Sequence, residues 1–319
     1  MSDIILHHYE LSPYSEKVRA ILGFKKLAWR SVLAPMILPK PDLIPLTGGY
    51  RKTPVLQIGR DVYCDSRLIV HVLERLRPAP AILPAALEAS CAAFALLEPT
   101  LFAAAMGTAF QPAGAQILVQ HIGLEAFEQF IKDRAELFKG GSARRPSHDF
   151  AEAHFLPLVG AVDRQLAGHP FLLGKEPTLA DFVTYHPIWF IARNPGVAGC
   201  LRPFAHVAAW MERMAGLGHG TPSELSSADA LAIARESSET GERGENQGSP
   251  PFLGTPVQLE RAQIGQRVTV SATDYGVDAV EGTLVHASTL EVAIQRHDER
   301  AGTVIVHFPR IDSRVAAVA

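Results

Sequence analysis

Cysteine is scarce in this 319-residue sequence, and neither sign of charge is in large excess. Cys64, Cys91 and Cys200 are an odd number at wide spacing, which suits neither a disulfide framework nor a zinc site and fits a reducing cytosol. The 30 basic and 33 acidic side chains leave a net charge of −3, so no global positive field attracts nucleic acid or anionic lipid. The histidines lack the spacing of metal ligands. We therefore expect neither a metal nor a nucleic-acid partner.

Long apolar segments are also few. The longest, residues 92–106, is interrupted by Glu98 and Pro99 and falls short of a bilayer span. Residues 1–9 contain Asp3 and two histidines and lack the basic and long apolar parts of a secretory signal. Hydrophobic residues make up 47% of the chain, enough to fill the cores of two to three domains. These features predict a cytoplasmic protein that has no membrane partner.

Residues 1–78 alternate short apolar runs with helical periodicity, which predicts an α/β domain. Four prolines between residues 34 and 47 predict a loop, because each fixes its own backbone and restricts its neighbour. The expected order is strand, helix, strand, irregular loop, hairpin and helix. The strands are expected at 4–6, 29–33, 55–58 and 62–64, and the helices at 14–22 and 66–76.

Composition changes three times after this domain. Residues 84–217 show helical periodicity throughout, and about five helices separated by glycine or proline predict an all-α domain. Residues 218–255 lose large apolar side chains, so we expect a linker with at most one short helix at 228–235. Residues 256–319 alternate β-branched and polar residues, which predicts a small antiparallel β domain, barrel-like or a sandwich.

The first motif that could carry chemistry is residues 12–15, Ser-Pro-Tyr-Ser. A strand that ends near Tyr9 and a helix that begins near Pro13 place the Ser12 hydroxyl among free backbone N–H groups. The helix dipole favours negative charge at that position, so a thiolate would be stabilised there. An ordinary N-cap followed by proline would have the same sequence.

Two further motifs flank the expected hairpin. The Thr53–Pro54 junction opens an apolar strand, and a cis bond there would turn the backbone groups of Thr53 toward a peptide-like ligand. The pair Asp65 and Ser66 opens a helix, where the Ser66 hydroxyl and helix N–H groups could hold a carboxylate and Asp65 an ammonium. Each motif alone is also compatible with a purely structural role.

The order and spacing of these three motifs resemble those of the soluble, cytosolic-type glutathione transferases. A second, distant segment, residues 171–181, is similar to the buried capping box of that family's helical domain, with Thr178 as the cap and Asp181 reaching back to it. The resemblance covers residues 3–217. It implies a thioredoxin-like glutathione-binding domain and an all-α domain, with the C-terminal β region added to them.

The resemblance also implies a reaction and roles for the motif residues. Ser12 would hydrogen-bond the sulfur of glutathione, the co-substrate, and favour its thiolate. That thiolate would attack a small hydrophobic electrophile, as in detoxification, and Phe102, Met106 and Phe110 are candidates for the electrophile pocket. The implied glutathione-binding residues are Thr53 and Pro54 for the cysteinyl part, Asp65 and Ser66 for the γ-glutamyl end, and Lys52, with Arg51 beside it, for the glycyl carboxylate.

Several alternatives stay open on the sequence alone. Tyr9 and Ser15 are rivals of Ser12 for the sulfur, because some family members use a tyrosine at the end of the first strand. The chain could instead be a non-catalytic binding or adaptor protein with the transferase fold, or a glutathione-dependent isomerase, dehalogenase or ether-cleaving enzyme. Since family members commonly dimerise, we also expect a homodimer.

Overall fold

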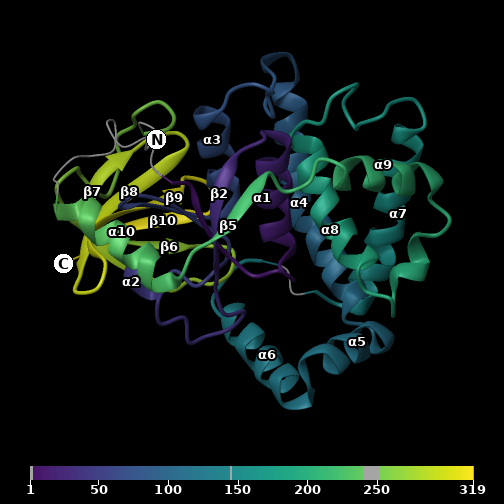
Figure 1. Cartoon of the computed structure of the whole chain (residues 1–319), viewed down its shortest axis with the longest axis horizontal. Coiled ribbons are helices and arrows are strands. Elements are labelled where there is room, and N and C mark those ends of the chain that lie inside the picture. The colour runs from purple at the N-terminus through teal and green to yellow at the C-terminus, as the bar shows by residue number, and fades with distance from the viewer. Residues whose placement is uncertain (1–2, 144–145, 240–251, 319) are drawn as a thin grey trace.

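A computed structural model describes residues 3–143, 146–239 and 252–318. Figure 1 shows an α/β part in the centre, a bundle of helices on one side and a C-terminal β region on the other. The expected architecture, a thioredoxin-like domain, an all-α domain and a C-terminal β region, is therefore confirmed.

The N-terminal domain has the predicted order of elements. Strand β1 pairs in parallel with β2 and antiparallel with β3, and β3 forms the hairpin with β4. The loop after β2 differs in one respect, because its last residues form a short helix, α2. The elements are β1 (Ile5–His8), α1 (Pro13–Phe24), β2 (Ala28–Leu33), α2 (Ile44–Thr47), β3 (Val55–Ile58), β4 (Asp61–Cys64) and α3 (Ser66–Leu76).

The helical domain contains the helices expected from the sequence, including a long one over the predicted segment 85–106. Helix α5 was missed, because the proline and glycine at its start are typical of turns. The helices are α4 (Glu88–Ala109), α5 (Pro112–Ile122), α6 (Leu124–Leu137), α7 (His148–Leu166), α8 (Leu179–Ala192) and α9 (Ala205–Ala215), with 3-10 turns η1 (Ala85–Leu87) and η2 (Ala198–Leu201).

The apolar segment 92–106, which was expected to fall short of a bilayer span, lies within a longer helix, α4. Together with η1 it runs over Ala85–Ala109 without a break, and by length and composition alone it could cross a membrane. Neither Glu98 nor Pro99 ends the helix. Mostly buried core helices of soluble proteins pass the same test, and α4 packs against α7 and α8, although only 33% of its apolar window is buried.

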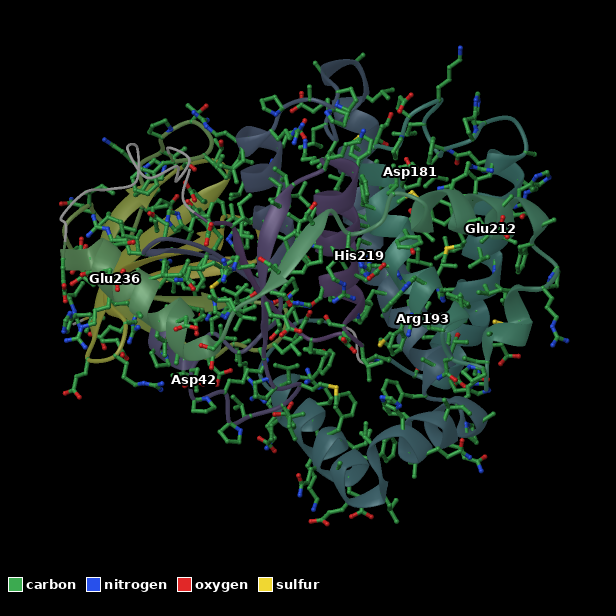
Figure 2. All side chains as sticks on the ribbon, in the orientation of Figure 1. Asp42, Asp181, Arg193, Glu212, His219 and Glu236 are labelled. Carbon is green, nitrogen blue, oxygen red and sulfur yellow. The ribbon has the colours of Figure 1, made fainter. Side chains whose placement is uncertain are left out.

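The predicted capping box is present at the start of α8. The Asp181 carboxylate accepts hydrogen bonds from the backbone N–H groups of Thr178, at 2.9 Å, and Leu172, at 2.8 Å. It also accepts from the indole N–H of Trp210 on α9, at 3.0 Å. Asp181, labelled in Figure 2, therefore ties the start of α8 to a preceding loop and to α9.

The segment expected as a linker is partly regular structure. Residues Thr221–Glu224 form strand β5, which pairs in parallel with β2, and Ser227–Glu239 form helix α10. Helix α10 buries Ala230, Leu231 and Ala234 against the sheet, so a few small apolar residues suffice where the composition is otherwise polar. Residues 240–251, also part of the expected linker, lie outside the described residues.

The C-terminal strands do not form a separate layer but extend the thioredoxin-like sheet. Strand β9 pairs in parallel with β4, which gives one ten-stranded sheet in the order β10-β6-β7-β8-β9-β4-β3-β1-β2-β5. A shared apolar core contains Leu46 and Val62 of the first domain together with Val268 and Ile294 of the C-terminal region. The strands are β6 (Arg267–Ala272), β7 (Val280–Ala287), β8 (Glu291–Asp298), β9 (Gly302–Pro309) and β10 (Ser313–Ala317).

Candidate functional site

Two adjoining cavities lie between the α/β part and the helical domain. The smaller has a volume of about 320 Å³ and is lined by Thr53, Asp65 and Ser66 among others. The larger has a volume of about 940 Å³ and is lined by Ser12 and by the three expected pocket residues. Shared walls of the two cavities include Tyr14, Lys52, Thr53, Phe102, Phe138 and Tyr275. Six of the residues singled out from the sequence, Ser12, Lys52, Thr53, Pro54, Asp65 and Ser66, therefore meet in one region.

Ser12 caps helix α1 at the edge of the larger cavity. Its Oγ accepts a hydrogen bond from the backbone N–H of Ser15 at 3.1 Å, which leaves the hydroxyl hydrogen free to donate to a ligand. Among its rivals, Tyr9 also lines this cavity. Ser15 is fully buried, lines neither cavity, and has a hydroxyl without a hydrogen-bond partner among the described residues. The cap geometry thus presents one donor, Ser12, at the first turn of the helix.

The Thr53–Pro54 peptide bond is cis, as the resemblance implied. Thr53 lines both cavities, and its Oγ1 accepts a hydrogen bond from the Nζ of Lys40 at 2.5 Å. Burial, helped by the nearby Arg134, lowers the pKa of Lys40 to about 7. Sequence reasoning missed Lys40; its only signal was a lone lysine within the proline-rich loop.

Asp65 and Ser66 open helix α3 on the wall of the smaller cavity. The Asp65 carboxylate caps the helix by accepting from the backbone N–H of Arg67 at 2.9 Å. Burial alone would raise the pKa of Asp65, but the cations of Arg67 and Lys52 hold it at about 2. Lys52 lies 3.9 Å from Asp65 and so stands beside the pair expected to bind the γ-glutamyl end.

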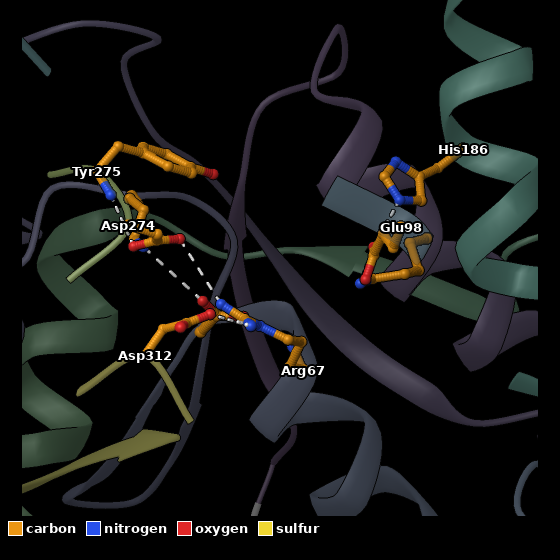
Figure 3. Close-up of polar contacts among 9 residues, drawn as sticks. Arg67, Glu98, His186, Asp274, Tyr275 and Asp312 are labelled. Atoms are coloured by element: carbon orange, nitrogen blue, oxygen red, sulfur yellow. Dashed lines mark hydrogen bonds and ion pairs between the residues drawn. The ribbon is translucent and has the colours of Figure 1, made fainter. Parts of the chain in front are cut away.

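The C-terminal β region also enters this site, which the sequence did not predict. Asp274, on the turn between β6 and β7, forms an ion pair of 2.8 Å with Lys52. Figure 3 shows Asp274 and Asp312 reaching the same guanidinium, that of Arg67, at 3.6 and 2.7 Å. Tyr275 stands beside them, with the Lys52 ammonium 4.3 Å from its ring centroid. Nothing local in the sequence marks these residues, because their partners lie more than 200 positions away.

A buried charged cluster supports the floor of the smaller cavity. Glu98 on α4 accepts from Lys17 on α1 at 2.6 Å and from His186 on α8 at 2.7 Å. Burial lowers the pKa of His186 to about 4, so its ring is neutral near pH 7 and donates to Glu98 through Nε2–H. Glu98 therefore connects the first helix of the α/β domain to two helices of the other domain.

The larger cavity is apolar with a cationic rim. Phe102, Met106 and Phe110 lie in its wall. Among the described residues, five cationic side chains and no aspartate or glutamate line it; the cations are Lys40, Arg51, Lys52, Arg134 and Arg193. Arg51 and Arg134 are paired with Asp133, outside the lining, and Lys52 with Asp274. Among the described residues, no group of three or more His, Cys, Asp or Glu side chains could hold a metal ion. The arrangement suits an anionic ligand with an apolar body.

Comparisons with known proteins agree with this geometry. Residues 6–81 match the glutathione S-transferase N-terminal domain, and residues 131–217 match the C-terminal domain. A solved GST-like protein from Pseudomonas syringae is 35% identical, with a TM-score of 0.76 and coverage of 100% of both chains. The chain belongs to the glutathione S-transferase family.

Two features of these matches refine the placement of this glutathione S-transferase family member. Because the Pseudomonas syringae protein is matched over its whole length, the likeness includes the C-terminal β region. A curated relative, probable maleylacetoacetate isomerase 1 of Drosophila melanogaster, is 36% identical over 86 residues. That match spans only 35% of the relative's length and 25% of this chain.

Proposed function

We propose that this chain is a glutathione transferase of the serine type. Ser12 would donate its hydroxyl hydrogen to the sulfur of glutathione, and the start of α1 would add its dipole. The observation that carries the proposal is the position of Ser12, which caps α1 at the wall of the larger cavity with a free hydroxyl hydrogen.

The energy required is within the reach of these two groups. A free thiol has a pKa of about 8.5, so only a few per cent is ionised at neutral pH. Lowering that pKa by about two units requires roughly 2.7 kcal/mol of preferential thiolate binding. One hydroxyl donor and one helix N-terminus contribute about 1 to 2 kcal/mol each. The thiolate would then attack an electrophile held in the larger cavity, whose walls orient the two reactants.

The remaining motif residues would hold the tripeptide across both cavities. Thr53, beside Pro54, would pair through its backbone with the cysteinyl part, and Asp65 and Ser66 would bind the γ-glutamyl end. Lys52 stays a candidate for a glutathione carboxylate. Lys40 is a second candidate for the glycyl carboxylate, because it lines the larger cavity and bonds Thr53.

The experiment compares turnover of an aryl halide with glutathione in wild type, Ser12→Ala and Tyr9→Phe. Loss of a hydrogen bond to a charged group costs about 1.5 to 3 kcal/mol, so Ser12→Ala is expected to lose roughly 10- to 100-fold in turnover while still binding glutathione. Tyr9→Phe serves as the matched hydroxyl deletion and should retain activity. The reverse pattern would assign the sulfur to Tyr9, and a wild type that binds no glutathione would refute the enzymatic proposal.

A second candidate is a glutathione-dependent isomerisation. It is favoured by the match to the curated isomerase, whose name indicates an acidic substrate, and by the five cations along the larger cavity. In this reaction the thiolate would add to the substrate and leave again, so the glutathione is regenerated. Turnover that consumes no glutathione would favour isomerisation over transfer. A non-catalytic adaptor would show binding with neither reaction.

We further propose that the protein is cytoplasmic and acts as a homodimer. The first half of α4 supports the dimer, because Leu96 and Leu97 expose apolar surface there, Leu96 to 70%. Sedimentation of the purified chain tests the oligomeric state.

A further inference from the structure

The turn between β6 and β7 is fixed against the helical domain by backbone contacts. The N–H groups of Ser142 and Ala143 donate to the carbonyls of Thr273 and Asp274, at 2.9 and 2.8 Å, and the N–H of Gly276 donates to Leu137 at 2.7 Å. Tyr275 stacks on Phe138, with ring centroids 5.1 Å apart. Because the backbone holds the turn, the side chains of residues 274 and 275 have defined positions in the site.

Carboxylates outnumber cations among the described residues of the smaller cavity. Three carboxylates, of Asp65, Asp274 and Asp312, share two cations there, Lys52 and Arg67. The other acid in the wall, Glu98, is already paired with buried Lys17. Each of these carboxylates has a cation within 4 Å, but the two cations are shared among all three. A cationic group on a ligand would give Asp274 a partner that it does not share with Asp65.

A buried hydroxyl at the same cavity also lacks a partner. Tyr50 lines the cavity and is 95% buried, since only 5% of it is exposed, and its hydroxyl has no hydrogen-bond partner among the described residues. Buried polar groups are almost always satisfied, so an unsatisfied one beside a cavity points to a ligand group. Burial, with Asp65 nearby, raises the pKa of Tyr50 well above its usual value, so the hydroxyl stays neutral and can donate or accept.

Tyr275 adds a boundary between the two cavities. It lines both, as does Tyr14. A ligand that reaches from Ser66 in the smaller cavity to Ser12 in the larger one must pass these two rings. The C-terminal region therefore contributes both a wall and charge to the place where such a ligand would lie.

We propose that Asp274 of the C-terminal β region, assisted by Asp312, binds the α-ammonium group of the ligand's γ-glutamyl end and so selects ligands that carry a free amino-acid terminus. This inference rests on the proposed binding of glutathione. It assigns the appended region a specificity role within the same chain, and the ligand's ammonium would add a third cation to the three described carboxylates of the smaller cavity.

A two-ligand binding experiment tests this assignment. Glutathione and glutaryl-cysteinyl-glycine, which lacks only the amino group, are titrated by calorimetry into wild type and Asp274→Asn. Wild type is expected to prefer glutathione. In Asp274→Asn, glutathione affinity should fall about tenfold, whereas the deaminated ligand should bind as well as before or more tightly, because Lys52 loses the nearer of its two internal partners. The preference for the ammonium should therefore largely disappear.

The matched control is Asp278→Asn, which removes the same formal charge from an exposed position of the same turn and should leave both affinities unchanged. If Asp274→Asn does not fold, the same two ligands are titrated into Asp312→Asn instead, and the preference for glutathione is compared with that of wild type. Equal effects on both ligands, or no effect on either, would overturn the role of these carboxylates while glutathione binding stands. A wild type that binds neither ligand would refute the proposed function itself.

Discussion

The Nε2 atom of His307 lies 2.9 Å from the Oδ1 atom of Asp61, which precedes it by 246 residues. The other ring nitrogen lies 2.9 Å from Glu291 on β8. One imidazole thus joins the first domain and two C-terminal strands, and the ring also stacks on Tyr63 at 4.3 Å between centroids. The contact belongs to the seam between β4 and β9.

This contact makes stability dependent on pH. Burial alone would lower the pKa of His307, but the carboxylates of Glu291 and Asp61 raise it to about 9. The folded-state pKa exceeds the unfolded value of about 6.5, so the stabilisation is complete below pH 6.5 and is lost as the pH rises through 9. The stabilisation lost over this pH range is about 3 kcal/mol. Urea unfolding of wild type and His307→Gln between pH 6 and 10 should reveal this loss only in wild type; parallel profiles would contradict it.

The buried pair of Lys17 and Glu98 predicts a second stability effect. Lys17→Met leaves Glu98 with neutral His186 as its remaining hydrogen-bond donor, and breaking a buried pair costs about 3 to 5 kcal/mol. The free energy of unfolding in urea should fall by that amount. Lys139→Met removes an exposed pair with Glu136 and should cost less than about 1 kcal/mol. Similar losses in both variants would exclude a special role for the buried pair.

Lys40 predicts a pH dependence of ligand binding. Because burial and Arg134 lower the pKa of Lys40 to about 7, its positive charge is present below pH 7 and lost above it. If Lys40 holds the glycyl carboxylate, the affinity for S-methylglutathione should decrease as the pH rises through 7. This ligand has no thiol to ionise, so the pH dependence of its affinity, measured by calorimetry, reports on the charge of Lys40. Lys40→Met should bind the ligand more weakly at pH 6, and its affinity should not change with pH. An affinity that still falls with pH in the variant would mean that another group is responsible.

Because Gly141 lies close to Asp274, the substitution Gly141→Ala is predicted to affect both stability and glutathione binding. A Cβ on residue 141 would lie 1.9 Å from the backbone oxygen of Asp274, so Gly141→Ala must displace the β6–β7 turn. We expect lower stability and, since Asp274 moves away from Lys52, weaker glutathione binding. Gly168→Ala, where nothing lies within 4 Å of the new Cβ, should change neither. Thermal unfolding and calorimetry of both variants give the comparison.

Local chemistry explains why much of the fold could be predicted. The cap at Ser12, the Thr53–Pro54 junction and the capping box of Thr178 and Asp181 depend on neighbours within a few residues, so their sequence patterns carry the information. The apolar spacing of helix α3 likewise predicts its buried face.

Long-range pairing explains what could not be predicted. The approach of Asp274 to Lys52 depends on the parallel pairing of β9 with β4, and nothing in either segment specifies the other. The segment around helix α10 resembles a linker in composition, and at most a short helix at 228–235 was expected there, because its neighbours in space provide most of the apolar surface that α10 contacts. Lys40 was missed for the same reason, since its partners Thr53 and Arg51 are set by the tertiary fold.

The pairing of β4 with β9 has a consequence for biosynthesis. Strand β4 leaves the ribosome long before β9, and at 5 to 20 residues per second a separation of 246 residues corresponds to roughly 10 to 50 s. During this interval the edge of β4 displays unpaired backbone groups that another nascent chain could bind. Completion of the C-terminal strands closes that edge, so chains interrupted before residue 302 are expected to aggregate more readily than finished ones.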